Sequence, residues 1–65
     1  MNKFELEIGI FYAKALYGFS RAFTAGKIYK IIGAENKGSW ISWRVKEDDA
    51  GLPNGWNSVY FEKID

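Results

Sequence analysis

The sequence contains no cysteine and no histidine among its 65 residues. Without thiols the chain cannot form a disulfide, and zinc sites built from cysteine or histidine are excluded. Catalysis by a serine–histidine or cysteine–histidine pair is excluded for the same reason. A glycine-rich loop that could cradle phosphate is also missing. We therefore predict that the protein is not an enzyme and needs no cofactor.

Long hydrophobic runs are missing too. No apolar run approaches the roughly 20 residues that a membrane-spanning helix needs. The apolar segment 8–16 follows Glu5 and Glu7 and is interrupted by Lys14, whereas a secretory signal begins with a positive segment. We interpret this segment as a strand, and we expect a cytoplasmic protein without membrane contact.

Aromatic side chains are abundant. Five Phe, four Tyr and three Trp make up 18% of the chain, which is typical of a folded domain and not of a disordered one. A chain this short forms one domain, residues 1–65, and needs heavy apolar side chains to offset the entropy lost on folding. Some of the aromatic residues could instead be held out for a partner.

The net charge is only +1, but the charges are unevenly distributed. Residues 11–46 carry seven Lys or Arg and a single acid, Glu35, whereas residues 47–65 carry five acids and Lys63. This pattern indicates either solvated strand faces beside an acidic loop, or a basic patch that attracts an anionic partner.

The clearest strand is Trp40–Lys46. Ile41, Trp43 and Val45 share one parity and are wholly apolar, so we predict that they face the core. The opposite parity is polar except for Trp40, which we predict to be exposed.

Other segments also have the composition of strands. A half-buried strand is expected at 5–8, within an N-terminal stretch 1–10 that adds to the sheet, with a break near Gly9. Further strands are expected from residue 11 onward, at 27–32, at 56–61 and at 61–64. Turns or loops are expected at 18–21, 35–38 and 48–55. Short strands with turns every 8–12 residues predict an all-β fold, a small barrel or sandwich.

Four motifs resemble SH3 domains in order and spacing over residues 13–64. Ala15–Phe19 resembles the ALYDY opening, Gly26–Ile31 the strand after the RT loop, Gly38–Trp40 the start of the third strand, and Ser58–Phe61 the SNYV segment. The resemblance implies a five-stranded SH3-like barrel with a short 3₁₀ turn before the last strand. The chain departs from SH3 domains in its short RT loop, which holds Arg21 and no carboxylate, and in having Trp56-Asn57 where a proline is usual.

A closer resemblance is to the small SH3-like barrel proteins of bacteriophages and prophages. It rests on Phe23–Ile31, on Asp48–Gly51 and on Tyr60–Ile64. The resemblance implies a small accessory protein that binds a host protein and modulates or inhibits it in the host cytoplasm. Because this fold hosts many functions, this expectation is an analogy.

The SH3 alignment implies a groove lined by aromatic rings, the usual anchors for a protein partner. We predict that the protein-binding residues are Tyr17, Phe19, Trp40 and Tyr60. Trp43 and Trp56, with Tyr29 and Phe61, are assigned to the core. Binding through the N-terminal edge strand, residues 5–10, is an independent mode.

Two alternatives remain open. Lys30, Arg44 and Lys46 share the outward parity with Trp40, and basic groups beside a stacking ring can hold a nucleic-acid strand. The aromatic patch could also pair with itself in a homo-oligomer. Asp48 and Asp49 lack the alternate ligand spacing of an EF-hand, so we interpret residues 47–49 as a solvated acidic turn and expect no metal site.

Overall fold

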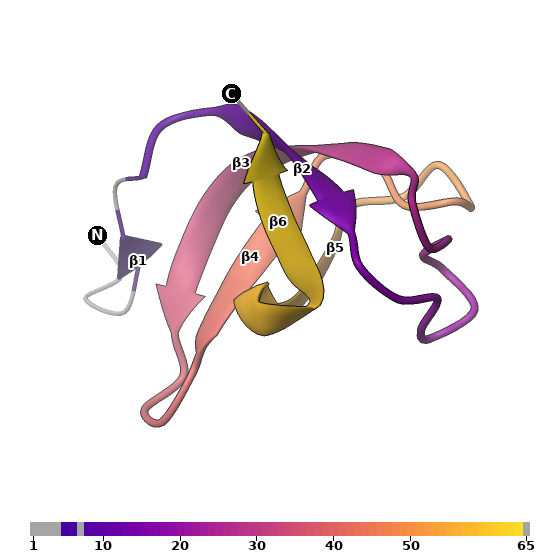
Figure 1. Cartoon of the computed structure of the whole chain (residues 1–65). Helices are drawn as coiled ribbons and strands as arrows, with labels where there is room; N and C mark the ends of the chain where they lie inside the picture. Colours follow the sequence, from indigo (N-terminus) through magenta and orange to yellow (C-terminus); the bar gives the residue numbers. More distant parts are fainter. Residues whose placement is uncertain (1–4, 7, 65) are drawn as a thin grey trace.

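The computed structural model describes residues 5–6 and 8–64, and the side chains of residues 8–64. The described chain is all-β, which confirms the predicted class (Figure 1). A single turn of 3₁₀ helix, η1, precedes the last strand, also as predicted. The elements in order are β1 (Glu5–Leu6), β2 (Phe11–Ala15), β3 (Ile28–Asn36), β4 (Ile41–Val45), β5 (Asn54–Asn57), η1 (Ser58–Tyr60) and β6 (Phe61–Ile64).

The strands form one antiparallel sheet in the order β5-β4-β3-β2-β6, and β1 pairs with β3 beside this path. The long strand β3 pairs with β2 through residues 28–31 and with β1 through Ala34 and Glu35. β1 and β2 therefore lie one after the other along the same edge of β3. In the described part of the chain β5 is not paired with β6, so the sheet is not closed. No helix there is long and apolar enough to cross a membrane.

A bulge in β3 determines which of its residues are buried. The register with β4 shifts between Ile31 and Gly33, because one extra residue on β3 changes the phase of the strand. Tyr29 and Ile31 are therefore buried before the bulge and Ala34 after it, whereas Ile32 is exposed. The alternation visible over residues 28–32 does not continue through the strand for this reason.

Gly9 separates β1 from β2, as the change of phase in the sequence predicted. Its φ is +73°, a conformation that strains any residue with a Cβ. β2 then begins at Phe11, so the chain leaves β3 at Leu6 and returns to it at Phe11.

The buried core is rich in aromatic rings. Its buried residues are Ala13, Ala15, Phe23, Tyr29, Ile31, Val45 and Phe61. Trp43 packs against this cluster and meets Phe11 edge-to-face, with ring centroids 4.9 Å apart. The core positions predicted for Tyr29, Ile31, Val45 and Phe61 are confirmed. Ile41 is only half-buried and lies outside the cluster, so its prediction was wrong.

The boundaries of two strands, and the burial of Ser42, differ from the predictions. β3 runs to Asn36, so the turn expected at 35–38 lies one to two residues later, where Lys37 N donates to Trp40 O at 2.9 Å. β5 already begins at Asn54, inside the expected loop. Ser42 is buried although its parity is polar. Gly55 explains this burial, since a Cβ there would lie 3.2 Å from Ser42 Oγ, and the missing side chain lets β5 cover the serine.

Candidate functional site

A groove lined by aromatic rings lies where the start of β4, strand β5 and η1 meet. It has a volume of about 370 Å³ and is lined by Trp40, Gly55, Trp56, Asn57 and Tyr60. Trp40 is 40% exposed, as its strand parity predicted. Trp56 and Tyr60 meet edge-to-face with their centroids 6.2 Å apart. The groove therefore presents flat apolar rings whose polar edges remain available to a ligand.

Tyr17 extends this surface on the side of Tyr60. The two rings meet edge-to-face at 5.9 Å, and Tyr17 is 58% exposed. Tyr17 is the second residue after the end of β2, and the intervening Leu16 donates its backbone N–H to Tyr60 O at 2.8 Å. This backbone bond holds the end of β2 against η1, which explains how residues 43 positions apart in sequence share one surface.

Phe19 supports the groove from beneath. Its ring stacks on Trp56 at 5.3 Å, meets Tyr60 at 4.8 Å and stacks on Phe23 at 4.7 Å. Phe19 is half-buried and packs against the core. Of the four residues predicted to bind a partner, the structure thus places Tyr17, Trp40 and Tyr60 along the surface of the groove and Phe19 below it.

Three residues of the groove lining, Gly55, Trp56 and Asn57, were not among the predicted binding residues, and Trp56 was assigned to the core alone. The structure gives it both roles: it packs against the core cluster and lines the groove. Asn57 Oδ1 accepts the backbone N–H of Val59 at 3.1 Å and so caps η1, which positions Tyr60.

The connection between β2 and β3 contains a tight hairpin at residues 19–23. Phe19 and Phe23 exchange both backbone hydrogen bonds at 3.2 Å, and Ala22 N donates to Phe19 O at 3.3 Å. Ser20 and Arg21 at its tip have φ of 54° and 53°. A type I′ turn requires positive φ at both central positions and favours Asn-Gly there. Two residues with side chains are therefore held in the left-handed region beside Phe19.

The basic residues predicted for nucleic acid do not gather around Trp40. Arg44 Nη2 lies 2.7 Å from Glu35 Oε1 in an ion pair. Lys30 and Lys46 are neighbours, since Lys46 N donates to Lys30 O at 3.0 Å. Trp40 and Lys46 flank the two ends of β4 and are six residues apart, a separation of about 20 Å in an extended chain.

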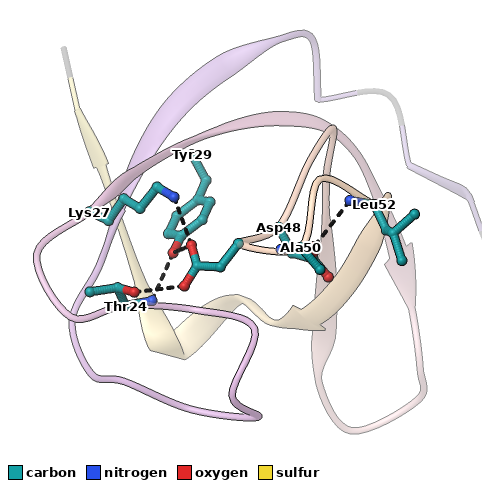
Figure 2. Close-up of polar contacts among 7 residues, drawn as sticks. Thr24, Lys27, Tyr29, Asp48, Ala50 and Leu52 are labelled. Carbon is teal, nitrogen blue, oxygen red and sulfur yellow. Dashed lines mark hydrogen bonds and ion pairs between the residues drawn. The ribbon is translucent and has the colours of Figure 1, made fainter.

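The acidic loop is exposed at Glu47 and Asp49, as predicted, but the carboxylates of Asp48 and Asp49 also form hydrogen bonds that were not predicted. Figure 2 shows how the side chains of Thr24, Lys27 and Tyr29 converge on the loop. Asp49 Oδ1 accepts Lys27 Nζ at 2.8 Å and the hydroxyl of Tyr29 at 2.8 Å, and Asp49 Oδ2 accepts Thr24 Oγ1 at 2.6 Å. Asp49 thereby ties the loop after β4 to the start of β3.

Asp48 organises the loop itself. Its Oδ1 accepts the backbone N–H groups of Ala50 at 2.8 Å and Leu52 at 3.1 Å (Figure 2). Its Oδ2 accepts Asn54 Nδ2 at 3.0 Å. The hydrogen bonds of Asp48 and Asp49 could not be predicted from the sequence, because the fold and the loop conformation bring their partners together.

These contacts shift the protonation equilibria of the loop. The hydrogen bond from Lys27, followed by those from Thr24 and Tyr29, lowers the pKa of Asp49 from 3.8 to about 2. The backbone N–H of Leu52 and the amide of Asn54 lower the pKa of Asp48. Burial, reinforced by the carboxylate of Asp49, raises the pKa of the Tyr29 hydroxyl. Asp49 therefore stays ionised over the physiological range and acts as a structural acceptor.

Within residues 5–6 and 8–64, no group of three or more acidic side chains is placed to hold a metal ion. Comparison of the chain with protein-family models, with curated proteins and with solved structures found no match. The interpretation of the site therefore depends on its own geometry.

Proposed function

We propose that the protein is a non-catalytic binding module that holds a segment of a partner protein in the aromatic groove. One observation carries the proposal: Trp40, Trp56 and Tyr60 line a single groove of about 370 Å³. Trp and Tyr are the residues most often found at energetically dominant positions of protein interfaces. Rings that are fixed from below, as Trp56 and Tyr60 are by Phe19, lose little conformational freedom when a ligand packs on them.

We further propose that the sheet belongs to a five-stranded SH3-like barrel. Support comes from the strand order β5-β4-β3-β2-β6 and from the 3₁₀ turn that joins β5 to β6. The contact between Tyr17 and Tyr60 is a second support, because two of the four motifs that carry the SH3 resemblance meet in it.

The biological role that we propose, a phage-encoded modulator or inhibitor of a host protein, rests on the sequence resemblance alone. The residues that carry it are Phe23–Ile31, Asp48–Gly51 and Tyr60–Ile64. The concrete form is inhibition by occlusion: the bound module covers a surface that the host protein needs. The site of action is then the cytoplasm of the host cell.

The proposal is tested by capture of partners from a host lysate with the wild-type protein and with Trp40→Ala. Leu52→Ala is the matched control, since Leu52 is 61% exposed and lies in the loop after β4. Trp40→Ala should lose the partner that wild type and Leu52→Ala retain, with unchanged circular dichroism for all three. Retention of the same partner at the same yield by Trp40→Ala would show that the groove is not the binding site.

The two alternatives have less support. For nucleic acid, Arg44 is already paired with Glu35 and Lys46 lies at the opposite end of β4 from Trp40, so the ring and the cations do not form one surface. Nucleic-acid binding would weaken steeply with salt, and a blank gel shift at low salt would eliminate it. A homo-oligomer would have a mass above 7.5 kDa in light scattering.

A further inference from the structure

Asn54 and Gly55 form an asparagine–glycine step at the start of β5, whereas the other asparagines of the sequence precede Lys3, Lys37 and Ser58. The amide carbon of an asparagine can be attacked by the backbone nitrogen of the next residue, which closes a succinimide ring. Glycine exposes this nitrogen most, because it has no Cβ to shield it. The sequence therefore places at β5 the dipeptide that is most open to this reaction.

The structure brings the two reacting groups into contact. The backbone N–H of Gly55 is donated to Asn54 Oδ1 at 2.8 Å, so it points at the side chain of the preceding residue. The carbon that is attacked, Asn54 Cγ, is bonded directly to this acceptor atom. Groups that are held together in this way react faster than groups that must first find each other.

The side-chain amide of Asn54 is also held at its other end. Its Nδ2 donates to Asp48 Oδ2 at 3.0 Å. Asp48 is fixed in turn, because its Oδ1 accepts the backbone N–H groups of Ala50 and Leu52. One hydrogen bond at each end of the amide therefore fixes its orientation toward Gly55.

Solvent has access to this site. Gly55 is exposed and Asn54 is half-buried. In the described part of the chain β5 is a terminal strand of the sheet, and a terminal strand has one edge open to water. The water and hydroxide that the reaction consumes can therefore reach the dipeptide.

We propose that Asn54 is a site of spontaneous deamidation, with the backbone nitrogen of Gly55 as the nucleophile and water as the co-reactant. Hydroxide removes the proton of the Gly55 N–H, and the nitrogen forms a bond to Asn54 Cγ. The bond between Cγ and Nδ2 breaks, and Nδ2 leaves as ammonia with a proton from water. Water then opens the succinimide at either carbonyl carbon, which leaves aspartate or isoaspartate at position 54. The inference goes beyond the proposed function and does not depend on it.

Both products alter the loop and the wall of the groove. The new carboxylate replaces the amide that now donates to Asp48 Oδ2, so an attractive contact becomes a repulsion between two negative charges. Isoaspartate also adds a carbon atom to the backbone of β5, directly before Gly55. Gly55 lines the groove and lies close over Ser42 Oγ. Deamidation is therefore expected to loosen the groove as well as the loop.

The first experiment incubates the full-length protein in mildly alkaline buffer and follows each asparagine by peptide mass mapping. Asn54 should be converted to a mixture of aspartate and isoaspartate, at a rate that rises with pH because the attacking nitrogen must lose its proton. Asn36 and Asn57 are internal controls and should react at least about tenfold more slowly, because a side chain shields the nitrogen that follows them. Equal survival of Asn54 and these controls would overturn the proposal. Conversion to aspartate without isoaspartate would also overturn it, because direct hydrolysis does not pass through a succinimide.

The second experiment repeats the incubation in urea, at the same pH, with the chain unfolded. Because the fold holds the reacting groups in contact, the native protein should react within about tenfold of the rate of the unfolded chain. A native rate lower than this would show that the fold protects the dipeptide, and it would overturn the inference. Asn54→Gln is the matched control: it keeps the amide but moves its carbon one methylene group farther from Gly55, and it should release no ammonia over the same time.

The third experiment measures what the modification does to the protein. Anion exchange separates the deamidated forms, and urea unfolding compares them with wild type and with Asn54→Asp. The midpoint should fall for Asn54→Asp, which changes the charge alone, and should fall further for the isoaspartate form, which also lengthens the backbone. An isoaspartate form as stable as wild type would overturn the expected effect on β5 and the groove.

Discussion

Tyr29 Oη donates a hydrogen bond to Asp49 Oδ1 at 2.8 Å and accepts one from the backbone N–H of Thr24 at 2.7 Å. The hydroxyl belongs to a residue that is only 3% exposed, so it must find partners inside the protein. Asp49 supplies one of them from a loop 20 residues later in the chain. The contact joins the core to the loop after β4, which is the part of the chain that leads into β5 and the groove.

Removal of this hydroxyl should destabilise the fold. Tyr29→Phe keeps the buried ring but leaves the Thr24 N–H without its partner, and we expect a loss of about 1–2 kcal/mol in the free energy of unfolding. Asp49→Ala removes the acceptor of three side chains and should lower the melting temperature further. Glu47→Ala, an exposed acid two residues away, should leave stability unchanged. Denaturant unfolding of the four proteins measures this order, and equal stability of Asp49→Ala and Glu47→Ala would contradict it.

Stability should fall in acid because of the same residue. The pKa of Asp49 is lowered from 3.8 to about 2 in the folded protein, so as the pH falls the unfolded chain takes up a proton first. The stabilisation by Asp49 is therefore fully present above pH 3.8 and is lost progressively down to about pH 2. The lowered pKa values of Asp48 and Glu35 add to the loss in the same direction.

Asp49→Asn separates this contribution from the general effect of acid. The variant should be less stable than wild type at neutral pH, and its urea midpoint should depend less on pH below 3.8. Parallel acid curves for wild type and Asp49→Asn would show that the carboxylate of Asp49 is not the group responsible.

The tip of the hairpin 19–23 should be a site where stability can be gained. Ser20 has φ of 54°, a conformation that costs a residue with a side chain about 1 kcal/mol or more. Ser20→Gly should therefore raise the free energy of unfolding by about 1 kcal/mol while keeping Arg21. Ser39→Gly is the control in another exposed turn, at a position without positive φ, and should be neutral or slightly destabilising. A decrease in stability for Ser20→Gly would mean that the side chain of Ser20 makes an essential contact.

Replacement by alanine should have different effects on stability at Trp40 and at Trp43. Trp43 packs edge-to-face on Phe11 at 4.9 Å and lies 6.1 Å from Phe61, so Trp43→Ala should cost about 3 kcal/mol of stability. Trp40 is 40% exposed, so Trp40→Ala should change stability by less than about 1 kcal/mol and remove partner binding. Thermal unfolding together with a binding assay distinguishes the two roles. A loss for Trp40→Ala as large as that for Trp43→Ala would place Trp40 in the core.

The local pattern of residues was sufficient for much of the fold. Alternation over short distances predicted the all-β class, the burial of Tyr29 and Val45 and the exposure of Trp40. The special freedom of glycine predicted the break at Gly9. These features depend on neighbours within a few residues, which is the range over which strand periodicity and turn conformation are set.

Other features depend on residues distant in sequence, and only the tertiary structure decided them. The bulge after Ile31 changed the phase of β3, and Gly55 allowed β5 to bury the polar Ser42. Trp56 became a wall of the groove as well as a core residue.

The acidic loop shows the division most clearly. By itself the sequence determined that the protein has twelve aromatic residues and an acidic stretch at 47–49, and that it has no cysteine or histidine side chain. It could not determine that Asp49 meets Tyr29, because the free energy of that contact depends on a geometry that the sheet creates between residues 20 positions apart. In the same way the tertiary structure decided which aromatic rings fill the core and which line the groove, since burial is set by packing across strands and not by residue type.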